Sequence, residues 1–157
     1  MFAELLTHPD RAWPPSGESP DWSAQSVAPR PGAPYGRRIL HASPAGEVLL
    51  LQWAPGIATA PHDHGGASGW VRVLQGQLEE QRYTRQGQSL QARGWRSVSL
   101  GSVSQVGAQD IHAMRAVGPA LSLHVYQPLP PRGMRLFPAQ GPALLVGPGC
   151  GAWWPAC

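Results

Sequence analysis

The chain has 157 residues, with twelve arginines, no lysine, nine acidic residues and a formal net charge of +3 at pH 7. That length predicts one domain with a sizeable core, and the scattered arginines, of which only Arg37 and Arg38 are adjacent, lack the basic stripe of a nucleic-acid binder. The sequence contains no run of eighteen apolar residues, so it predicts no membrane span. Its start contains Glu4 and Asp10 and is unlike a secretory signal.

Glycine and proline are abundant, at 19 and 18 residues, which favours short strands joined by turns over long helices. Residues 2–6 predict a short helix, and the Pro-, Ser- and Gly-rich stretch from Pro14 to Pro34 predicts an extended arm. Beyond Tyr35, seven short runs separated by turn signals are typical of strands: Arg37–His41, Val48–Trp53, Gly69–Leu74, Leu78–Tyr83, Arg96–Leu100, Ile111–Ala116 and Leu121–Tyr126.

These runs predict an all-β fold, a jelly-roll barrel in which two sheets face each other. The step Gln75-Gly76-Gln77 between two of the runs predicts a tight hairpin. The expected organisation is an N-terminal arm with its short helix over 1–34, one barrel domain over 35–140 and a C-terminal tail over 141–157.

Both cysteines, Cys150 and Cys157, lie in this tail. Their spacing is compatible with a local disulfide and equally with two free thiols, so their role stays open. Because neither lies in the body of the chain, no disulfide framework holds the fold together. A reducing cytoplasm is the simplest compartment.

Histidines carry the strongest functional signal. His62 and His64 are one residue apart on an expected extended segment, so their side chains point to the same side of a sheet. Both imidazoles can then reach one metal ion, and His112 from another strand can complete the set. A lone histidine is more often a surface residue or a hydrogen-bonded core residue, but the spaced cluster favours a metal site.

The spacing around these histidines resembles the two signature motifs of the cupin superfamily. Gly56 lies six residues before His62, Gly76 lies twelve after His64, and His112 lies eleven after Gly101. Most cupins place a glutamate ligand after the histidine pair, but here that position falls at Ser68 or Gly69.

The expected ligand set is therefore three neutral imidazoles. Such a set leaves up to three positions open on an octahedral metal and leaves its positive charge uncompensated, which favours an anionic ligand such as a thiolate. Zinc also accepts three histidines and a water, so the ligand count leaves a hydrolase or hydratase open.

From Tyr35 to about Pro130 the chain resembles the thiol dioxygenase family of cupins, typified by cysteine dioxygenase. The matching pieces occur in the family's order: Tyr35-Gly-Arg37, Leu51-Gln-Trp53, His62-Asp-His64, Leu74-Gln-Gly76, His112 and Ser122-Leu-His124-Val-Tyr126. The resemblance implies an Fe(II) enzyme that adds both atoms of O2 to the sulfur of a small thiol and gives a sulfinate.

The resemblance also implies roles for residues beyond the ligands. Ser122, His124 and Tyr126 share one face of a strand and would form a hydrogen-bonded relay that ends at the Tyr126 phenol. Arg37 would bind the substrate carboxylate with help from the Tyr35 hydroxyl, and the pocket wall would include Leu51, Trp53 and Thr59.

Two departures or ambiguities accompany these roles. Gly69 stands where animal family members carry a cysteine that crosslinks to the relay tyrosine, so the Tyr126 phenol is expected to stay unmodified. The carboxylate-binding arginine is not unique in the sequence, since Arg38, Arg132 and Arg135 are alternatives to Arg37.

The charged residues beside the ligands are expected to be structural. Asp63 lies between two ligands on a strand, so it should point away from the metal and steady the turn. Glu79 and Glu80 follow the expected hairpin and are interpreted as solvated charges.

The resulting hypothesis is a cytoplasmic Fe(II)-dependent dioxygenase of a small carboxylated thiol, with L-cysteine the first candidate and 3-mercaptopropionate the alternative. A redox-inactive Zn or Ni cupin and a cupin that only binds a ligand are the competing classes. The expected partners are the thiol and O2, with no nucleic acid and no membrane, and the protein is expected to be a monomer or a weak homo-oligomer.

Overall fold

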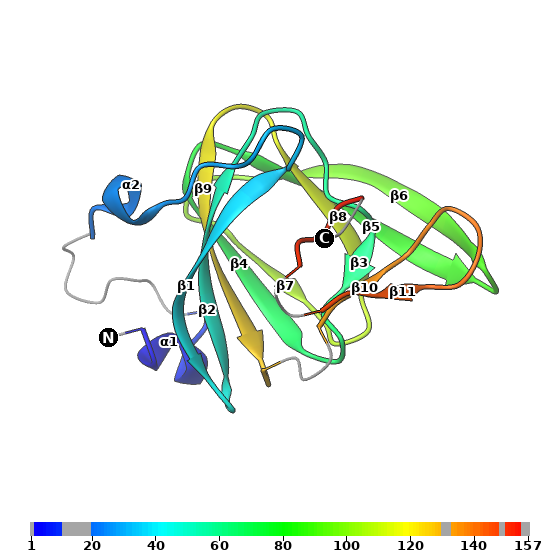
Figure 1. Ribbon diagram of the computed structural model, residues 1–157, viewed down its shortest axis with the longest axis horizontal. Helices are drawn as coiled ribbons and strands as arrows, with labels where there is room; N and C mark the ends of the chain where they lie inside the picture. The colour runs from blue at the N-terminus through cyan, green and yellow to red at the C-terminus, as the bar shows by residue number, and fades with distance from the viewer. Residues whose placement is uncertain (1, 11–19, 130–132, 148–149, 155–157) are drawn as a thin grey trace.

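Two antiparallel sheets face each other and enclose the core in the computed structural model, which describes residues 2–10, 20–129, 133–147 and 150–154 (Figure 1). One sheet has the order β1-β2-β9-β4-β7, with β1 at Tyr35–Ser43, β2 at Gly46–Trp53, β9 at Ala120–Gln127, β4 at Ser68–Gln75 and β7 at Val103–Val106. The other has the order β11-β10-β3-β8-β5-β6, with β11 at Leu144–Leu145, β10 at Arg135–Leu136, β3 at His62–Asp63, β8 at Ile111–Ala116, β5 at Leu78–Gln86 and β6 at Ser89–Val98.

The core forms because alternate residues of each strand point between the sheets. On β2, Leu49, Leu51 and Trp53 share the inner face and are buried against inner residues of β4 and β8. The same face of the barrel carries the functional side chains, so the packing that stabilises the fold also fixes their directions.

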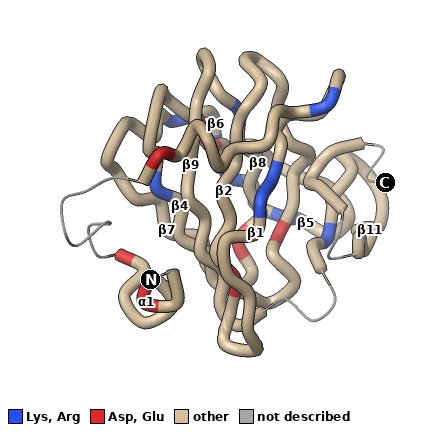
Figure 2. The backbone as a smooth tube through the Cα atoms, turned by 60° about the vertical axis from the view of Figure 1, so that its left-hand side comes forward, with Lys and Arg blue, Asp and Glu red and all other residues tan. Residues whose placement is uncertain are grey.

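The outer face of the five-stranded sheet is covered by the N-terminal part of the chain. The helices α1 (Glu4–Thr7) and α2 (Trp22–Gln25) lie on this side (Figure 1), and Figure 2 shows α1 in the turned view. Leu5 and Leu6 of α1 pack against Val48, Leu123 and Val125. Both faces of β9 are therefore covered, which places its inner polar residues deep in the protein.

The sequence predicted much of this architecture, and the all-β jelly-roll barrel is confirmed. Six of the seven predicted runs lie inside β1, β2, β4, β5, β8 and β9, whereas Arg96–Leu100 only overlaps the end of β6. The predicted helix at 2–6 is the helix α1, and the predicted arm contains α2, although residues 11–19 of the arm lie outside the described ranges.

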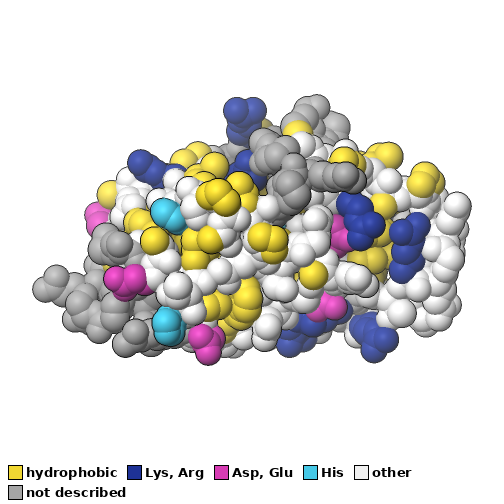
Figure 3. All heavy atoms as spheres, turned by 90° about the horizontal axis from the view of Figure 1, so that it is seen from below, with side chains coloured by type: hydrophobic (Ala, Val, Ile, Leu, Met, Phe, Trp, Pro, Cys, Tyr) yellow, Lys and Arg dark blue, Asp and Glu magenta, His cyan; other side chains and the backbone are white. Residues whose placement is uncertain are grey.

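The surface agrees with the scattered arginines of the sequence. On the face shown in Figure 3, the arginine side chains are interspersed with acidic, polar and apolar ones. Within the described ranges, no helix combines the length and the apolar content that crossing a bilayer would require.

The predicted hairpin at Gln75-Gly76-Gln77 is wrong. The turn joins β4 to β5, which belong to opposite sheets and do not pair with each other. The alternating pattern on both sides is real, but the two strands face one core from opposite sides. Gly76 makes this corner with a φ of +73°, and a Cβ on it would lie 2.3 Å from the carbonyl oxygen of Pro119.

We expect Gly76→Ala to destabilise the fold by about 2–4 kcal/mol, because the new methyl group meets backbone atoms in addition to the left-handed strain. Gly87→Ala is the matched control, since Gly87 has a φ of +61° but open space around it. That variant should lose only about 1–2 kcal/mol. Urea unfolding of both variants measures the difference, and equal losses would contradict the steric argument.

Candidate metal centre

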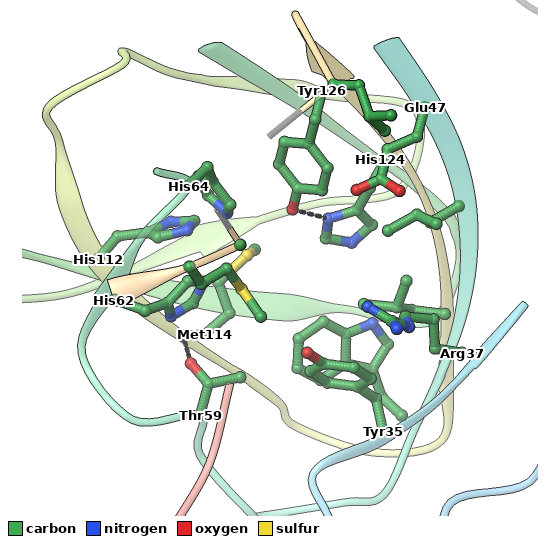
Figure 4. A pocket seen from close by; sticks show the side chains of 16 residues that line it. Tyr35, Arg37, Glu47, Thr59, His62, His64, His112, Met114, His124 and Tyr126 are labelled. Carbon is green, nitrogen blue, oxygen red and sulfur yellow. Dashed lines mark hydrogen bonds between the residues drawn. The ribbon is translucent and has the colours of Figure 1, made fainter. Parts of the chain in front are cut away.

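Three buried histidines converge at one end of the cavity between the sheets (Figure 4). His62 lies on β3 and pairs in register with His112 of β8, while His64 directly follows β3. One nitrogen from each ring can be chosen so that the three atoms all lie within 4.8 Å of one another. The structure thus brings together the three residues that the sequence predicted as ligands.

Strand alternation explains why two ligands come from alternate positions, His62 on β3 and His64 just after it. Asp63, between them, points to the opposite side, where its carboxylate accepts from Nε of Arg135 (2.8 Å) and from the backbone N–H of Gly65 (3.1 Å). This agrees with the expected role of Asp63 in steadying the turn.

The imidazoles of His62 and His64 are neutral. Burial, reinforced by the neighbouring ring of His112, lowers the pKa of His62 to about 3, and burial lowers the pKa of His64 well below its ordinary value. Nδ1 of His62 donates to the carbonyl of Ala60 (2.8 Å), so its Nε2 carries a lone pair.

The ring nitrogens leave unmet hydrogen-bonding capacity. Both nitrogens of His64 and Nε2 of His112 are buried, and no described residue gives them a hydrogen-bond partner. Buried polar atoms normally have a partner. Three converging lone pairs on neutral imidazoles are the donor set that a transition metal ion or zinc prefers, so these residues fit a metal.

Glu80 stands directly behind one of these ligands, and its predicted role as a solvated charge is wrong. Its side chain is fully buried, and Nδ1 of His112 donates to its Oε1 (2.9 Å). Its other oxygen accepts from Nε of Arg96 and from Ser104 Oγ, and Arg82 lies within 3.5 Å. Glu79 does face outward, half-buried, where it pairs with Arg115.

Burial alone would raise the pKa of Glu80, but the hydrogen bond from His112 and the guanidinium groups of Arg96 and Arg82 outweigh it and hold the pKa at about 2. The ionised carboxylate fixes the proton of His112 on Nδ1 and leaves Nε2 free for a metal. The signal in the sequence was the shared face of Leu78, a core residue, and Glu80 two positions later.

A chain of hydrogen bonds lies across the cavity from the three histidines, on β9. Ser122 Oγ lies 2.8 Å from Nε2 of His124, and Nδ1 of His124 lies 2.8 Å from the Tyr126 hydroxyl. Nε1 of Trp53 donates to the same Ser122 oxygen at 2.8 Å. The structure therefore assembles the predicted relay and adds Trp53, which the sequence had placed only in the pocket wall.

Trp53 sets the direction of this relay. An indole N–H can only donate, so Ser122 accepts from Trp53 and can direct its own hydroxyl proton to Nε2 of His124. In that tautomer His124 carries its proton on Nδ1 and donates it to the Tyr126 oxygen. Burial lowers the pKa of His124 to about 3 and raises that of Tyr126 well above its ordinary value, so both are neutral. The phenolic proton remains available to the cavity.

Gly69 leaves the room that the Tyr126 ring needs. A Cβ on Gly69 would lie 2.7–2.8 Å from two ring carbons of Tyr126. The opposite side of the ring stacks on His64, with the centroids 4.3 Å apart. Glycine has no side chain that could crosslink, so an unmodified Tyr126 phenol stays the prediction.

The cavity between the histidines and β1–β2 has a volume of about 210 Å3. Its walls contain all four predicted substrate-binding residues together with the predicted wall residue Thr59: Tyr35, Arg37, Leu51, Trp53 and Thr59. Glu47, Leu49 and Met114 also line it, and the sequence interpretation had not singled out any of these three.

The structure separates the candidate arginines. Arg37 is half-buried and points into the cavity (Figure 4), whereas Arg38 is exposed and donates to the carbonyl of Gln25. Arg135 is held by Asp63 behind the ligands and does not line the cavity. Arg132 lies outside the described residues. The geometry thus favours Arg37.

The C-terminal segment completes one wall. The backbone N–H of Ala152 donates to the Tyr35 hydroxyl (3.0 Å), and its carbonyl accepts from the N–H of Ala60 (2.7 Å), two residues before the first histidine. Trp153 packs edge-on against Tyr35. The pairing of Cys150 with Cys157 cannot be described, because Cys157 lies outside the described residues.

Comparison with known proteins supports this site and fold. The sequence model of cysteine dioxygenase type I matches residues 31–137, which include every residue of the three-histidine cluster and the relay. Among solved structures, an uncharacterised protein with a double-stranded β-helix domain from Klebsiella pneumoniae has a TM-score of 0.61 at 19% identity, over 81% of this chain and 96% of that one.

Two further structures have the same fold. KdgF from Halomonas sp. has a TM-score of 0.53 at 20% identity, over 65% of this chain and 84% of that one. The DMSP lyase DddQ from Ruegeria pomeroyi has a TM-score of 0.56 at 17% identity, over 70% of this chain and 55% of that one. At such identities the likeness establishes the double-stranded β-helix and nothing about chemistry.

Glu80→Gln should weaken metal binding by about 10- to 100-fold, because the amide no longer holds His112 with a charged acceptor. Glu79→Gln, the same change on the outward face, should leave the affinity unchanged. Competition titration of iron(II) and of zinc against a chelator measures both variants. Equal affinities in the wild-type protein and Glu80→Gln would contradict the assigned role.

Proposed function

We propose, from the premise that this chain belongs to the cysteine dioxygenase type I family, that it is an iron(II)-dependent dioxygenase of a small carboxylated thiol. L-Cysteine is the first candidate substrate and 3-mercaptopropionate the second. One observation carries the proposal: three buried, converging imidazoles share a small cavity with a relay tyrosine and an inward-pointing arginine.

The overall reaction joins a thiol and O2 to give a sulfinic acid. Both oxygen atoms end on sulfur, which loses four electrons as O2 gains them, so no external reductant is required. His62, His64 and His112 would hold the iron, which when bound supplies the redox chemistry that no side chain provides.

Arg37 would bind and orient the substrate. A guanidinium can hold a carboxylate through two charge-assisted hydrogen bonds. Because Arg37 projects from β1 toward the three histidines, a carboxylate bound there directs the other end of a short molecule to the metal centre (Figure 4). Such positioning lowers the entropic part of the reaction barrier.

Tyr126 would supply a proton at the oxygen side. With the His124 proton on Nδ1, the Tyr126 hydroxyl oxygen would accept from His124, and its own proton would point to the cavity rather than into the relay. The raised pKa of the phenol keeps that proton in place until a more basic oxygen or sulfur atom accepts a hydrogen bond from it. Trp53 and Ser122 maintain this orientation.

The remaining walls would exclude water. Leu49, Leu51 and Met114 are buried apolar residues that line the cavity. A dry cavity strengthens the electrostatic contacts made by Arg37 and limits side reactions of the activated thiol.

The decisive experiment is an oxygen-electrode panel of small thiols on protein loaded separately with iron(II) and zinc. The iron form should consume O2 and thiol in equal amounts and release a sulfinate identified by mass spectrometry, while the zinc form should be inactive. Thiol binding without O2 uptake in the iron form would overturn the proposal and favour a ligand-binding cupin. Product formation without O2 uptake in the zinc form would instead favour a lyase or hydrolase.

Arg37→Ala should lower kcat/KM for carboxylated thiols by the value of a charged hydrogen bond, about 1.5–3 kcal/mol, or roughly 10- to 150-fold. Arg38→Ala is the control, since the side chain of Arg38 is exposed and does not line the cavity. Steady-state sulfinate production measures both. An unchanged kcat/KM in Arg37→Ala for every carboxylated thiol would show that the assignment is wrong.

A further inference from the structure

An open seam separates two edge strands of the barrel. β6 ends the six-stranded sheet and β7 ends the five-stranded sheet, and within the described ranges these two strands do not pair with each other. Edge strands leave backbone N–H and C=O groups without a ladder partner. A hollow of about 480 Å3 lies in the seam, between residues 93–96 of β6 and residues 103–105 of β7. It shares no lining residue with the cavity of the metal centre.

Three arginines line this hollow: Arg82, Arg93 and Arg96. Arg96 reaches across the seam and donates to Ser104 Oγ of β7 (2.8 Å), and Arg82 donates to the backbone carbonyl of Gln105. Two of the three guanidinium groups are thus fixed in place by contacts with the opposite sheet. Because like charges close together repel one another, an anion placed among them stabilises the cluster.

A bulge in β6 brings the third arginine into the hollow. Arg93 and Arg96 are three positions apart, so regular alternation would place them on opposite faces of the strand. The register of β5 on β6 shifts between Gln81 and Tyr83, and the bulge contains Gly94 with a φ of +86°. Such a bulge redirects the side chains of its strand. Both arginines therefore line the same hollow.

Carboxylates compensate two of the three positive charges. Nε of Arg96 donates to Glu80 (2.8 Å), and Nη1 of Arg82 lies 3.3 Å from Asp110. Arg93 is exposed, and among the described residues no carboxylate forms an ion pair with it. The cluster thus keeps one uncompensated positive charge.

Unused hydrogen-bond donors remain on two of these arginines. Arg93 is anchored by Nε, which donates to Thr84 Oγ1 (2.8 Å), and no described residue accepts a hydrogen bond from its two terminal nitrogens. On Arg96, Nε and Nη2 are bonded to Glu80 and Ser104, which leaves Nη1. The hollow therefore offers charged donors from two positions of β6.

We propose that the seam binds a tetrahedral oxyanion of the phosphate or sulfate class. Arg93 holds it through its terminal nitrogens and Arg96 through Nη1, while Arg82 adds its charge. Guanidinium groups bind such oxyanions through charge-assisted hydrogen bonds that are frequently bidentate. A phosphate group carries up to two negative charges and presents oxygens in several directions, so it can contact guanidinium groups that come from different positions of a strand.

The bound anion would link the two sheets. It contacts β6 directly, and Arg82 and Arg96 are already bonded to β7. A ligand that binds only the folded chain stabilises that chain against unfolding. The inference does not depend on the proposed dioxygenase chemistry, because the hollow and the substrate cavity have separate walls.

Inorganic phosphate is the probe. Amide NMR spectra of the zinc-loaded protein, which is diamagnetic, should show saturable shifts centred on residues 93–96 and 103–105 when phosphate is added at constant ionic strength. Sodium chloride, which supplies only screening, should not reproduce them. Glycerol 3-phosphate distinguishes the two sources of the group. Equal affinity supports recognition of the free anion, and tighter binding supports a phosphate ester whose organic part occupies the rest of the hollow.

Variants assign the binding to the arginines. Arg93→Gln should weaken phosphate by roughly 10-fold or more, since charged hydrogen bonds are lost, and Arg93→Lys, which keeps the charge without the fork, should lie between. Arg85→Gln is the matched control, because it removes a positive charge from the same hairpin outside this hollow, and it should bind as the wild type does. Phosphate should raise the Tm of the wild type and of Arg85→Gln more than that of Arg93→Gln.

Equal affinities in Arg93→Gln and Arg85→Gln, or shifts that chloride reproduces, would overturn the site. Saturable shifts centred elsewhere on the protein would overturn it too, and this wild-type measurement holds even where a variant does not fold. Binding of polyglutamate without any binding of phosphate would replace the oxyanion site with a surface for an acidic protein segment.

Discussion

The site depends on keeping three imidazole rings close together inside the barrel, with those of His62 and His64 uncharged. Because burial lowers the pKa of His62 and His64 far below neutrality, each of these rings keeps an unprotonated nitrogen, and its lone pair is available to a metal ion. Such an arrangement is unsatisfied in an apolar interior unless a cation lies between the rings. The opposite sheet, whose inner side chains pack against those of the histidine-bearing strands, is what maintains this burial.

Charges are distributed around this neutral centre in two layers. Behind it, the Glu80 carboxylate and its guanidinium partners are bonded to one another, so they orient His112 without leaving a free charge in the core. In front, Arg37 and Glu47 point into the cavity, where a ligand meets them. In the proposed function, the first layer would orient a metal ligand and the second would contact the substrate. Changes in one layer should therefore leave the other largely intact.

Period-two alternation explains both what the sequence revealed and what it concealed. It correctly placed His62 with His64, and Ser122 with His124 and Tyr126, because matching polar residues at alternate positions are conspicuous. The same alternation applies to Glu80 beside Leu78 and to Glu47 beside Leu49. An isolated charged residue is ordinarily at the surface, however, so the pattern alone does not predict that these two side chains point inward. Strands of two residues, such as β3, are too short to show any period, and no local pattern tells whether a turn such as that at Gly76 stays within one sheet.

The backbone of Ala152 ties the far end of the chain to the barrel at two points, the Tyr35 hydroxyl and the strand lead-in at Ala60. Both points belong to the cavity wall or adjoin a metal-site histidine. A change in the length of the tail would therefore alter the cavity wall at Tyr35 without any substitution in the barrel. Variation in this tail offers a route by which proteins with one catalytic core diverge in the molecules they accept.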